Sequence, residues 1–271
     1  MVLNAIYGPD EKDLSVREAS FNWDANLDWR KLRIGYLKRD FELPTPPPQQ
    51  QPREETNLTD EQRKRREEAL ANRALFQAQR QYDHKFDDAA LEKIRSMGVN
   101  LIPVEMPQLP FQGMRSILVA EAAAAFDELT RSGRDKLLTE QSPQDWPNTF
   151  RTARFIPAVE YIQANRARTL AIQQMAKIFE QVDVIVAPTN AGQLTITNLT
   201  GHPAVIVPNG LRGDDAPKPR VLPTGEEDAG GPGTPVSLTF LANLYEEAKL
   251  AAFARAYQEA TGFHLQHPKL A

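Results

Sequence analysis

Apolar residues along the chain alternate between the spacing of a strand and the spacing of a helix. Residues 32–37 and 99–104 have short apolar runs that predict two strands. Between them, apolar side chains three and four positions apart mark one face of a helix over residues 86–97. A strand, a helix and a second strand in this order form a βαβ unit, whose two strands lie parallel in one sheet.

The rest of the chain extends this pattern with three strands and three helices. The strands are predicted at residues 182–187, 202–207 and 236–240, and the helices at residues 117–129, 156–179 and 241–260. The nearly continuous apolar runs are typical of strands in a sheet that is covered on both faces. We therefore predict an α/β fold with a central mixed β-sheet flanked by helices.

Residues 43–82 interrupt the alternation. Their first part is rich in proline and glutamine, which is typical of a stiff surface spacer or of a peptide that a partner recognises. A charged helix is expected to follow, with Thr59 as its N-cap and Gln62 completing a capping box. Its basic cluster at residues 63–66 is compatible with RNA contact, but the acidic flanks favour a solvated face. We interpret the segment as an insertion between the first strand and its helix.

The first residues read as the end of a helix. Val2, Leu3 and Ile6 fall on one helical face, and Gly8 followed by Pro9 predicts a stop. No cap or first turn precedes them. A frayed terminal helix explains this pattern, and so does a helix whose beginning lies upstream. On the second interpretation the domain is incomplete at its N-terminus.

Composition excludes several classes of protein. The 36 acidic and 32 basic residues leave a net charge of −4, which argues against binding nucleic acid through a basic face. The lack of cysteine excludes disulfides, thiolate metal sites and a cysteine nucleophile. No apolar run approaches the length of about 18 residues that predicts a membrane span, and the N-terminus does not resemble a secretory signal. We expect a cytoplasmic protein with neither a nucleic-acid nor a membrane partner.

The residues by themselves predict no catalytic centre. The sequence contains no nucleophile elbow, zinc-protease helix motif, P-loop or dinucleotide fingerprint. Its seven serines do not lie in a Gly/Ser-rich loop, which is the simplest source of backbone donors for an oxyanion. His264 and His267 have a spacing compatible with metal binding but no third ligand, so we predict neither a metal site nor a cofactor.

Several blocks, taken in order, resemble the C-terminal half of the amidase signature family. The most specific is residues 197–210, whose sequence Thr-Asn-Leu-Thr-Gly-His-Pro-Ala-Val-Ile-Val-Pro-Asn-Gly is similar to the family segment N-x-x-G-x-P-A-x-x-x-P-x-G. Further blocks that fit are residues 5–10, 32–36, 183–189, 235–238 and 257–264. The resemblance implies that residues 1–271 are the C-terminal part of a single amidase-like α/β domain, interrupted by the insertion at about 43–82.

The resemblance also implies how the chemistry is divided. In that family a lysine, a serine in a cis peptide and a nucleophilic serine hydrolyse amides, and all three lie in the N-terminal half. No residue of this chain inherits those roles. The C-terminal half completes the sheet and supplies one wall of the substrate pocket, which makes Arg154, Thr195 and Asn198 the substrate-binding candidates. Structural roles are the alternatives, such as an ion pair between Arg154 and Glu160 or a turn hydrogen bond from Asn198.

Two functions from different classes follow from this resemblance. The first is the C-terminal part of an amide hydrolase, which is inactive alone and binds a small-molecule amide once the N-terminal half is supplied. Amidotransferase members bind a substrate amino group through an acidic residue near the position of Gly192 and Gln193, so a charged amino-acid substrate is not expected. The second is a non-catalytic binding protein on a degenerate scaffold. In either case an exposed sheet edge favours a protein partner or self-association.

Overall fold

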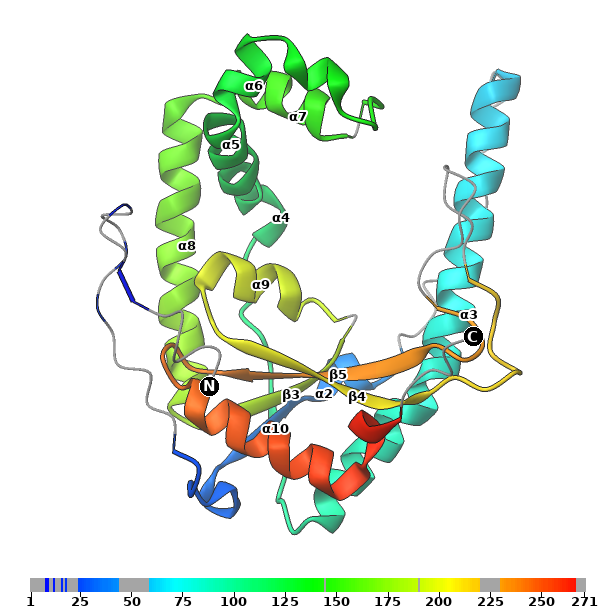
Figure 1. Cartoon of the computed structure of the whole chain (residues 1–271), viewed down its shortest axis with the longest axis vertical. Helices are drawn as coiled ribbons and strands as arrows, with labels where there is room; N and C mark the ends of the chain where they lie inside the picture. Colours follow the sequence, from blue (N-terminus) through cyan, green and yellow to red (C-terminus); the bar gives the residue numbers. More distant parts are fainter. Residues whose placement is uncertain are drawn as a thin grey trace. The chain divides into compact units, whose positions relative to one another are not determined.

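The described residues of the computed structural model form two compact units (Figure 1). The described residues are 8–9, 12, 16, 18, 24–43, 59–143, 145–189, 191–219 and 230–266. The first unit draws on Met1–Glu105, Val182–Ala191 and Pro203–Ala271, and the second on Met106–Gln181 and Gly192–His202. The helix end expected at residues 2–6 lies outside the described residues. The interpretation of the chain as part of a single domain stays a prediction.

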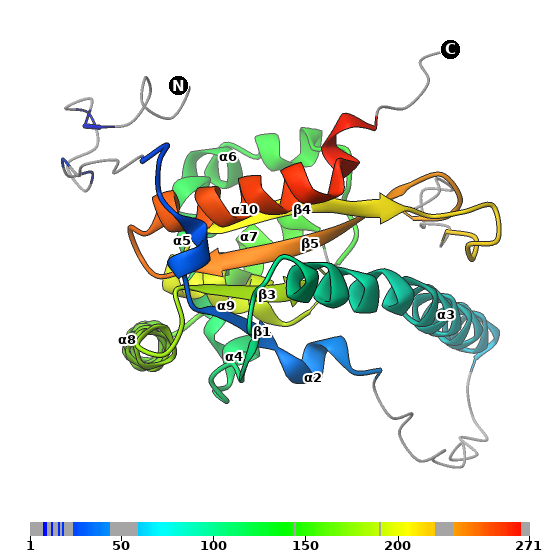
Figure 2. The same ribbon diagram turned by 90° about the horizontal axis from the view of Figure 1, so that it is seen from below.

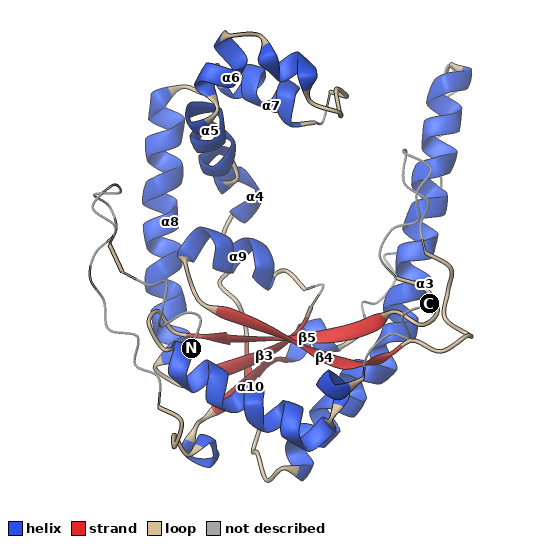
Figure 3. Ribbon diagram, viewed as in Figure 1, coloured by secondary structure: helices blue, strands red, loops and turns tan. Residues whose placement is uncertain are grey.

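In its described residues the first unit contains a five-stranded mixed sheet (Figure 3). In spatial order the strands are β2 (Ile102–Val104), β1 (Ile34–Leu37), β3 (Val184–Pro188), β5 (Pro235–Ala242) and β4 (Ala204–Leu211). Strand β1 is parallel to both β2 and β3, whereas β5 is antiparallel to β3 and β4. The predicted α/β class with a central mixed sheet is confirmed, as is the parallel pairing of the βαβ unit.

Two helices of the first unit cover one face of the sheet (Figure 2). The helical elements of this unit are η1 (Trp29–Lys31), α2 (Lys38–Phe41), α3 (Asp60–Ser96), α10 (Glu247–Thr261) and η3 (Phe263–Leu265). Ile94 of α3 and Phe253 and Tyr257 of α10 pack in the same core as Phe240 of β5. The Phe240 ring meets Phe253 and Tyr257 edge-on, with centroids 5.1 and 5.5 Å apart. Burying each such side chain contributes about 2–3 kcal/mol, which holds the helices on the sheet.

The charged helix predicted in the second half of the insertion does not end before the core helix begins. The charged helix and the core helix that the sequence predicts separately are one continuous 37-residue helix, α3. Its expected capping box is confirmed, because Thr59 Oγ1 accepts from the Gln62 amide and Gln62 Oε1 accepts from the Thr59 amide. No glycine or proline stands between Thr59 and Gly98 to end the helix. Residues 44–58 of the insertion lie outside the described residues.

The last predicted helix also begins later than expected. Leu241 and Ala242, placed in that helix by the sequence pattern, instead complete β5 and pair with Ile185 and Val184 of β3. Helix α10 starts at Glu247. An apolar run at the end of a buried strand has the same composition as the start of a buried helix, and the pairing with β3 decides between them.

The described part of the second unit is helical. Its elements are α4 (Phe111–Met114), α5 (Ser116–Ala125), α6 (Asp127–Arg131), η2 (Arg134–Leu137), α7 (Trp146–Ala153), α8 (Ala158–Phe179) and α9 (Gln193–Thr200). Helix α5 packs against α7 and α8, and α9 packs against α8 and α4. The helix predicted over residues 117–129 is broken at Phe126, which leaves helical geometry between α5 and α6. No helix within the described ranges combines the length and apolarity that crossing a membrane requires.

Candidate functional site

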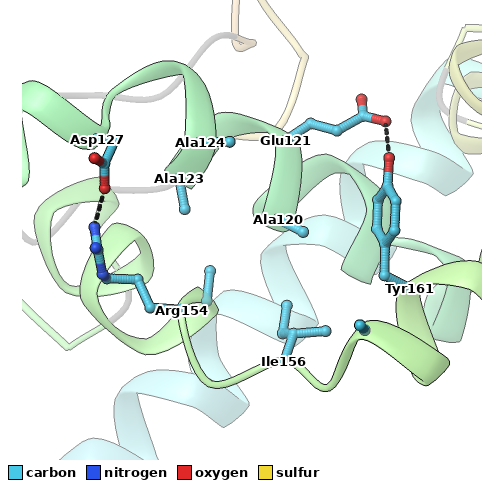
Figure 4. Close-up of a pocket in the computed structure, with 10 residues that line it drawn as sticks. Ala120, Glu121, Ala123, Ala124, Asp127, Arg154, Ile156 and Tyr161 are labelled. Carbon is cyan, nitrogen blue, oxygen red and sulfur yellow. Dashed lines mark hydrogen bonds and ion pairs between the residues drawn. The ribbon is translucent and has the colours of Figure 1, made fainter.

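A cleft of about 570 Å³ lies within the second unit, between α5 and the segment that joins α7 to α8 (Figure 4). Small methyl groups form most of its surface, together with the side chain of Ile156. The alanines that line it are Ala120, Ala123, Ala124, Ala153 and Ala158. Alanine leaves space between two packed segments, and a cleft of this volume falls in the range of about 300–1,000 Å³ typical of small-molecule sites.

An ion pair bounds one end of the cleft. Arg154 follows the last turn of α7, and its Nη1 donates to Oδ1 of Asp127 at the start of α6 (Figure 4). The second carboxylate oxygen of Asp127 is 3.6 Å from Nη1 of Arg131. The hydrogen bond from Arg154 and the two positive charges lower the pKa of Asp127. This carboxylate is therefore ionised at neutral pH, and its charge is compensated by arginine.

A carboxylate and a phenol bound the other end. The hydroxyl of Tyr161, in the first turn of α8, donates to Oε1 of Glu121 on α5 over 2.9 Å (Figure 4). Both side chains line the cleft and are accessible to solvent at its rim. The hydrogen bond orients the carboxylate and leaves its other oxygen available as an acceptor. The site thus combines an apolar middle with a polar group pair at each end.

The structure places one of the three predicted substrate-binding residues in this cleft. Arg154 lines it, and its ion-pair partner is Asp127 and not Glu160. Thr195 and Asn198 lie on α9, three positions apart and so on one face of that helix, and they are not among the residues that line the cleft. Asn198 is helical and exposed, so it does not act as a turn residue.

The block that carries the family resemblance folds as a helix followed by a strand. Gly201 ends α9 in the left-handed region, with φ at 79°, a conformation that glycine adopts without strain. The buried His202 follows, and its ring stacks on Phe179 with centroids 5.3 Å apart. The hydroxyl of Thr200 donates to the Ile196 carbonyl, so Nδ1 of His202 donates to that hydroxyl. Burial lowers the pKa of His202, which makes the neutral imidazole its ordinary state in the folded protein.

Comparison with known proteins finds amidases among those similar to this chain. No family model matches the chain. An amidase from Pseudomonas putida is 24% identical over 212 residues, which cover 67% of this chain and 40% of that protein. The A subunit of glutamyl-tRNA(Gln) amidotransferase from a Marinomonas species is 25% identical over 224 residues, covering 68% and 42%. The crystal structure of an amidase family protein from Bacillus anthracis matches 100% of this chain and 47% of its own, with 15% identity and a TM-score of 0.57.

The chain is thus similar in sequence to an amidase and to an amidotransferase A subunit, and its fold matches that of amidase-signature enzymes. It spans less than half the length of the curated relatives it matches, 40% of the Pseudomonas amidase and 42% of the Marinomonas protein. The structural likeness, at 15% identity, concerns the fold. The resemblance that the sequence blocks indicated is therefore confirmed, while activity, substrate and partners are proposals.

Sequence reasoning missed the two carboxylates that line the cleft, Glu121 and Asp127. Glu121 and Asp127 did not stand out, because the run of residues 120–125 reads only as an alanine-rich helix. A signal was present around that run, since Glu121 and Asp127, six positions apart, enclose four consecutive alanines and Phe126. The contacts with Tyr161 and Arg154 span 40 and 27 residues, and such distant pairs are not visible in the pattern of one sequence.

Outside the cleft, the described residues contain neither an activated serine nor a metal cluster. Ser237 Oγ accepts from the hydroxyl of Thr189 over 3.1 Å, and no lysine or histidine of the described ranges bonds to it. It therefore has no activating base within the described part. No cluster of three His, Asp or Glu side chains there has the arrangement of a metal site. His264 lies in η3, and His267 falls outside the described residues.

Proposed function

We propose that the chain is the C-terminal part of an amidase-family hydrolase of carbon–nitrogen bonds in small-molecule amides. It contributes the five-stranded sheet and one wall of the substrate pocket. The nucleophilic serine, its partner serine and the lysine are supplied by a segment other than residues 1–271, so we expect the chain to be inactive alone. The observation that carries this proposal is the cleft in the second unit, which Arg154 lines.

The mechanism assigns binding and orientation to this chain. In the completed enzyme, acyl transfer passes through a serine ester, and backbone amides stabilise the oxyanion. Arg154 presents guanidinium donors at the cleft, and Thr195 and Asn198 present a hydroxyl and an amide on one face of α9. Groups of these kinds hold an amide substrate by hydrogen bonds to its carbonyl and N–H. Precise positioning of this type lowers the barrier without any covalent bond between substrate and wall.

The sheet edge supports a protein partner for this chain. Strand β4 pairs with β5 and with no other described strand, and its Ile206 is 61% exposed. The outer edge of such a strand, with exposed apolar side chains, is a template for pairing with another chain. We propose that the completing segment, or a second copy of this chain, covers it. A cytoplasmic location and the absence of a nucleic-acid partner stay predictions from the sequence.

A non-catalytic binding protein is the second candidate. Ser237 accepts a hydrogen bond from the hydroxyl of Thr189 and has no base within the described residues, as expected of a degenerate scaffold. On this alternative the cleft binds a ligand without turnover, whatever segment is added to the chain.

A chimera tests the two candidates. The amino-terminal part of the Pseudomonas putida amidase, up to the point where its match begins, is fused ahead of residue 1. We expect the chimera to hydrolyse 4-nitroacetanilide, and we expect neither part to do so alone. Arg154→Ala in the chimera is expected to lower kcat/KM by about tenfold, because a pocket donor is lost.

Arg134→Ala is the matched control for that substitution. Arg134 is also in the second unit and pairs with Glu128, but it does not line the cleft. Equal activity of the two variants would contradict the role of Arg154. A folded chimera that binds substrate and has no turnover favours the binding protein.

A further inference from the structure

The two ends of the alanine-lined cleft differ in charge. At one end Asp127 is compensated by Arg154 and Arg131. At the other end Glu121 receives one hydrogen bond from a neutral phenol, and no lysine or arginine of the described ranges pairs with it. The lining therefore carries two carboxylates and one guanidinium, and the uncompensated negative charge sits at the Glu121 end.

The Glu121 end has the parts of a cation site. The hydroxyl of Tyr161 fixes one carboxylate oxygen at 2.9 Å, which leaves the other oxygen for a ligand. The Tyr161 ring also lines the cleft, and an aromatic face attracts a cation within about 6 Å of its centroid. Figure 4 shows this pair at the opposite end of the cleft from Arg154, with the methyl groups of Ala120, Ala123 and Ala124 between them.

We propose that this cleft binds a small organic cation, a primary ammonium carried on an apolar body. The ammonium bonds to the free oxygen of Glu121 against the ring of Tyr161, and the apolar body lies over the alanine methyl groups. The proposal deepens the proposed function, on which it rests for the idea that the cleft takes part of an amide substrate. That substrate class is an amide with a positively charged group a short apolar distance from the scissile bond.

This assignment differs from the expectation drawn from the sequence. The absence of an acidic residue at Gly192 and Gln193 argued against a charged amino-acid substrate. Glu121 supplies a carboxylate from a different element, α5. In the proposal it binds an amine carried on an apolar body, and not the α-amino group of an amino acid.

Alanine-methyl NMR of the full chain tests the site without turnover. The protein carries ¹³C in its alanine methyl groups and is titrated with 2-phenylethylammonium or with its neutral isostere, 2-phenylethanol. We expect saturable shifts of the cleft methyl resonances by the ammonium, with affinity at least about tenfold tighter than for the alcohol. Raising the salt concentration to about 1 M is expected to remove most of that difference, because an accessible ion pair is screened.

Substitutions then assign the binding to Glu121. Glu121→Gln is expected to reduce ammonium affinity to that of the alcohol, whereas Glu160→Gln leaves it unchanged. Glu160 precedes Tyr161 in the chain and has the same charge, but it does not line the cleft. Tyr161→Phe keeps the ring and loses the hydrogen bond, so we expect an intermediate loss of about threefold. The spectrum of each variant without ligand reports whether its fold is intact.

Two results would overturn the proposal: equal affinity for the ammonium and the alcohol, or equal loss in Glu121→Gln and Glu160→Gln. The outcomes also separate it from the proposed function. Ammonium binding together with an inactive chimera would support the cation site and contradict the hydrolase proposal. An active chimera without ammonium binding would support the hydrolase proposal and contradict the cation site.

Discussion

Asn209 and Tyr257 show how a single buried polar contact joins three elements of the first unit. Asn209 Nδ2 donates to the Phe86 carbonyl in α3 over 2.9 Å, and its Oδ1 accepts from the Tyr257 hydroxyl of α10. Burial raises the pKa of Tyr257, so the phenol stays protonated and acts as a donor. The side chain of Asn209 on β4 thereby connects that strand to both α3 and α10.

Removing that hydroxyl is expected to destabilise the fold. Tyr257→Phe leaves the buried Asn209 Oδ1 without its donor, and we expect a loss of about 1–3 kcal/mol in the free energy of unfolding. Urea unfolding followed by circular dichroism measures it. Tyr245→Phe is the control, because Tyr245 is exposed. Equal midpoints for the two variants would show that the contact contributes nothing.

At the residue scale, the sequence predicted which residue lines the cleft better than it predicted that residue's ion-pair partner. Arg154 was identified through the family resemblance, and it does line a cleft. Its ion pair with Asp127 could not be foreseen, because the two residues are brought together by the break at Phe126 and the packing of α6 on α7. The roles of Thr195 and Asn198 in binding stay predictions.

At the scale of elements, Asp87 makes the attachment of α3 depend on pH. Asp87 is buried, and this burial, with the nearby carboxylates of Asp83 and Asp88, raises its pKa from 3.8 to about 6, against the opposing charge of Arg80. Between those two pH values the folded chain binds more protons at this site than the unfolded chain does. The contribution of Asp87 to stability is therefore greatest below about pH 4 and is lost as the pH rises through 6.

Asp87→Asn isolates this effect. Relative to the variant, we expect the wild-type chain to lose up to about 3 kcal/mol of unfolding free energy between pH 4 and pH 7. Chemical denaturation at a series of pH values measures the difference, in which the shifts of other groups cancel. Glu92→Gln on the same helix is the control, because Glu92 is exposed and is not among the charges that shift the pKa of Asp87. Parallel stability curves for wild type and Asp87→Asn would contradict the assignment.

Elements were predicted well where a local signal marks their ends. The capping box at Thr59 marks the start of α3, and the left-handed Gly98, with φ at 90°, follows its end, so both signals lie where the sequence rules place them. Helix α9, which Gly201 ends, was not predicted. Errors occurred where no such signal exists. Helix α3 was divided in two because its composition changes from charged to apolar without a glycine or proline, and composition alone does not end a helix.

At the scale of the whole molecule, the sequence predicted the class of the sheet but not its order. Consecutive strands are only sometimes neighbours, and here β3 lies beside β1 and β5 while β4 is at the edge. The hydrophobic pattern of the sequence did not indicate that β4 lies at the edge of the sheet. Together with its exposed Ile206, it links the fold to the proposed need for a covering partner.

The division of labour between this chain and a catalytic segment is the central claim. Turnover of 4-nitroacetanilide by the purified chain alone, followed by the absorbance of released 4-nitroaniline, tests it most directly. We predict no hydrolysis above the buffer rate, because Ser237 has no base among the described residues and the sequence has no Gly/Ser-rich loop. Hydrolysis that a serine-directed inhibitor abolishes would contradict the claim and place the nucleophile within residues 1–271.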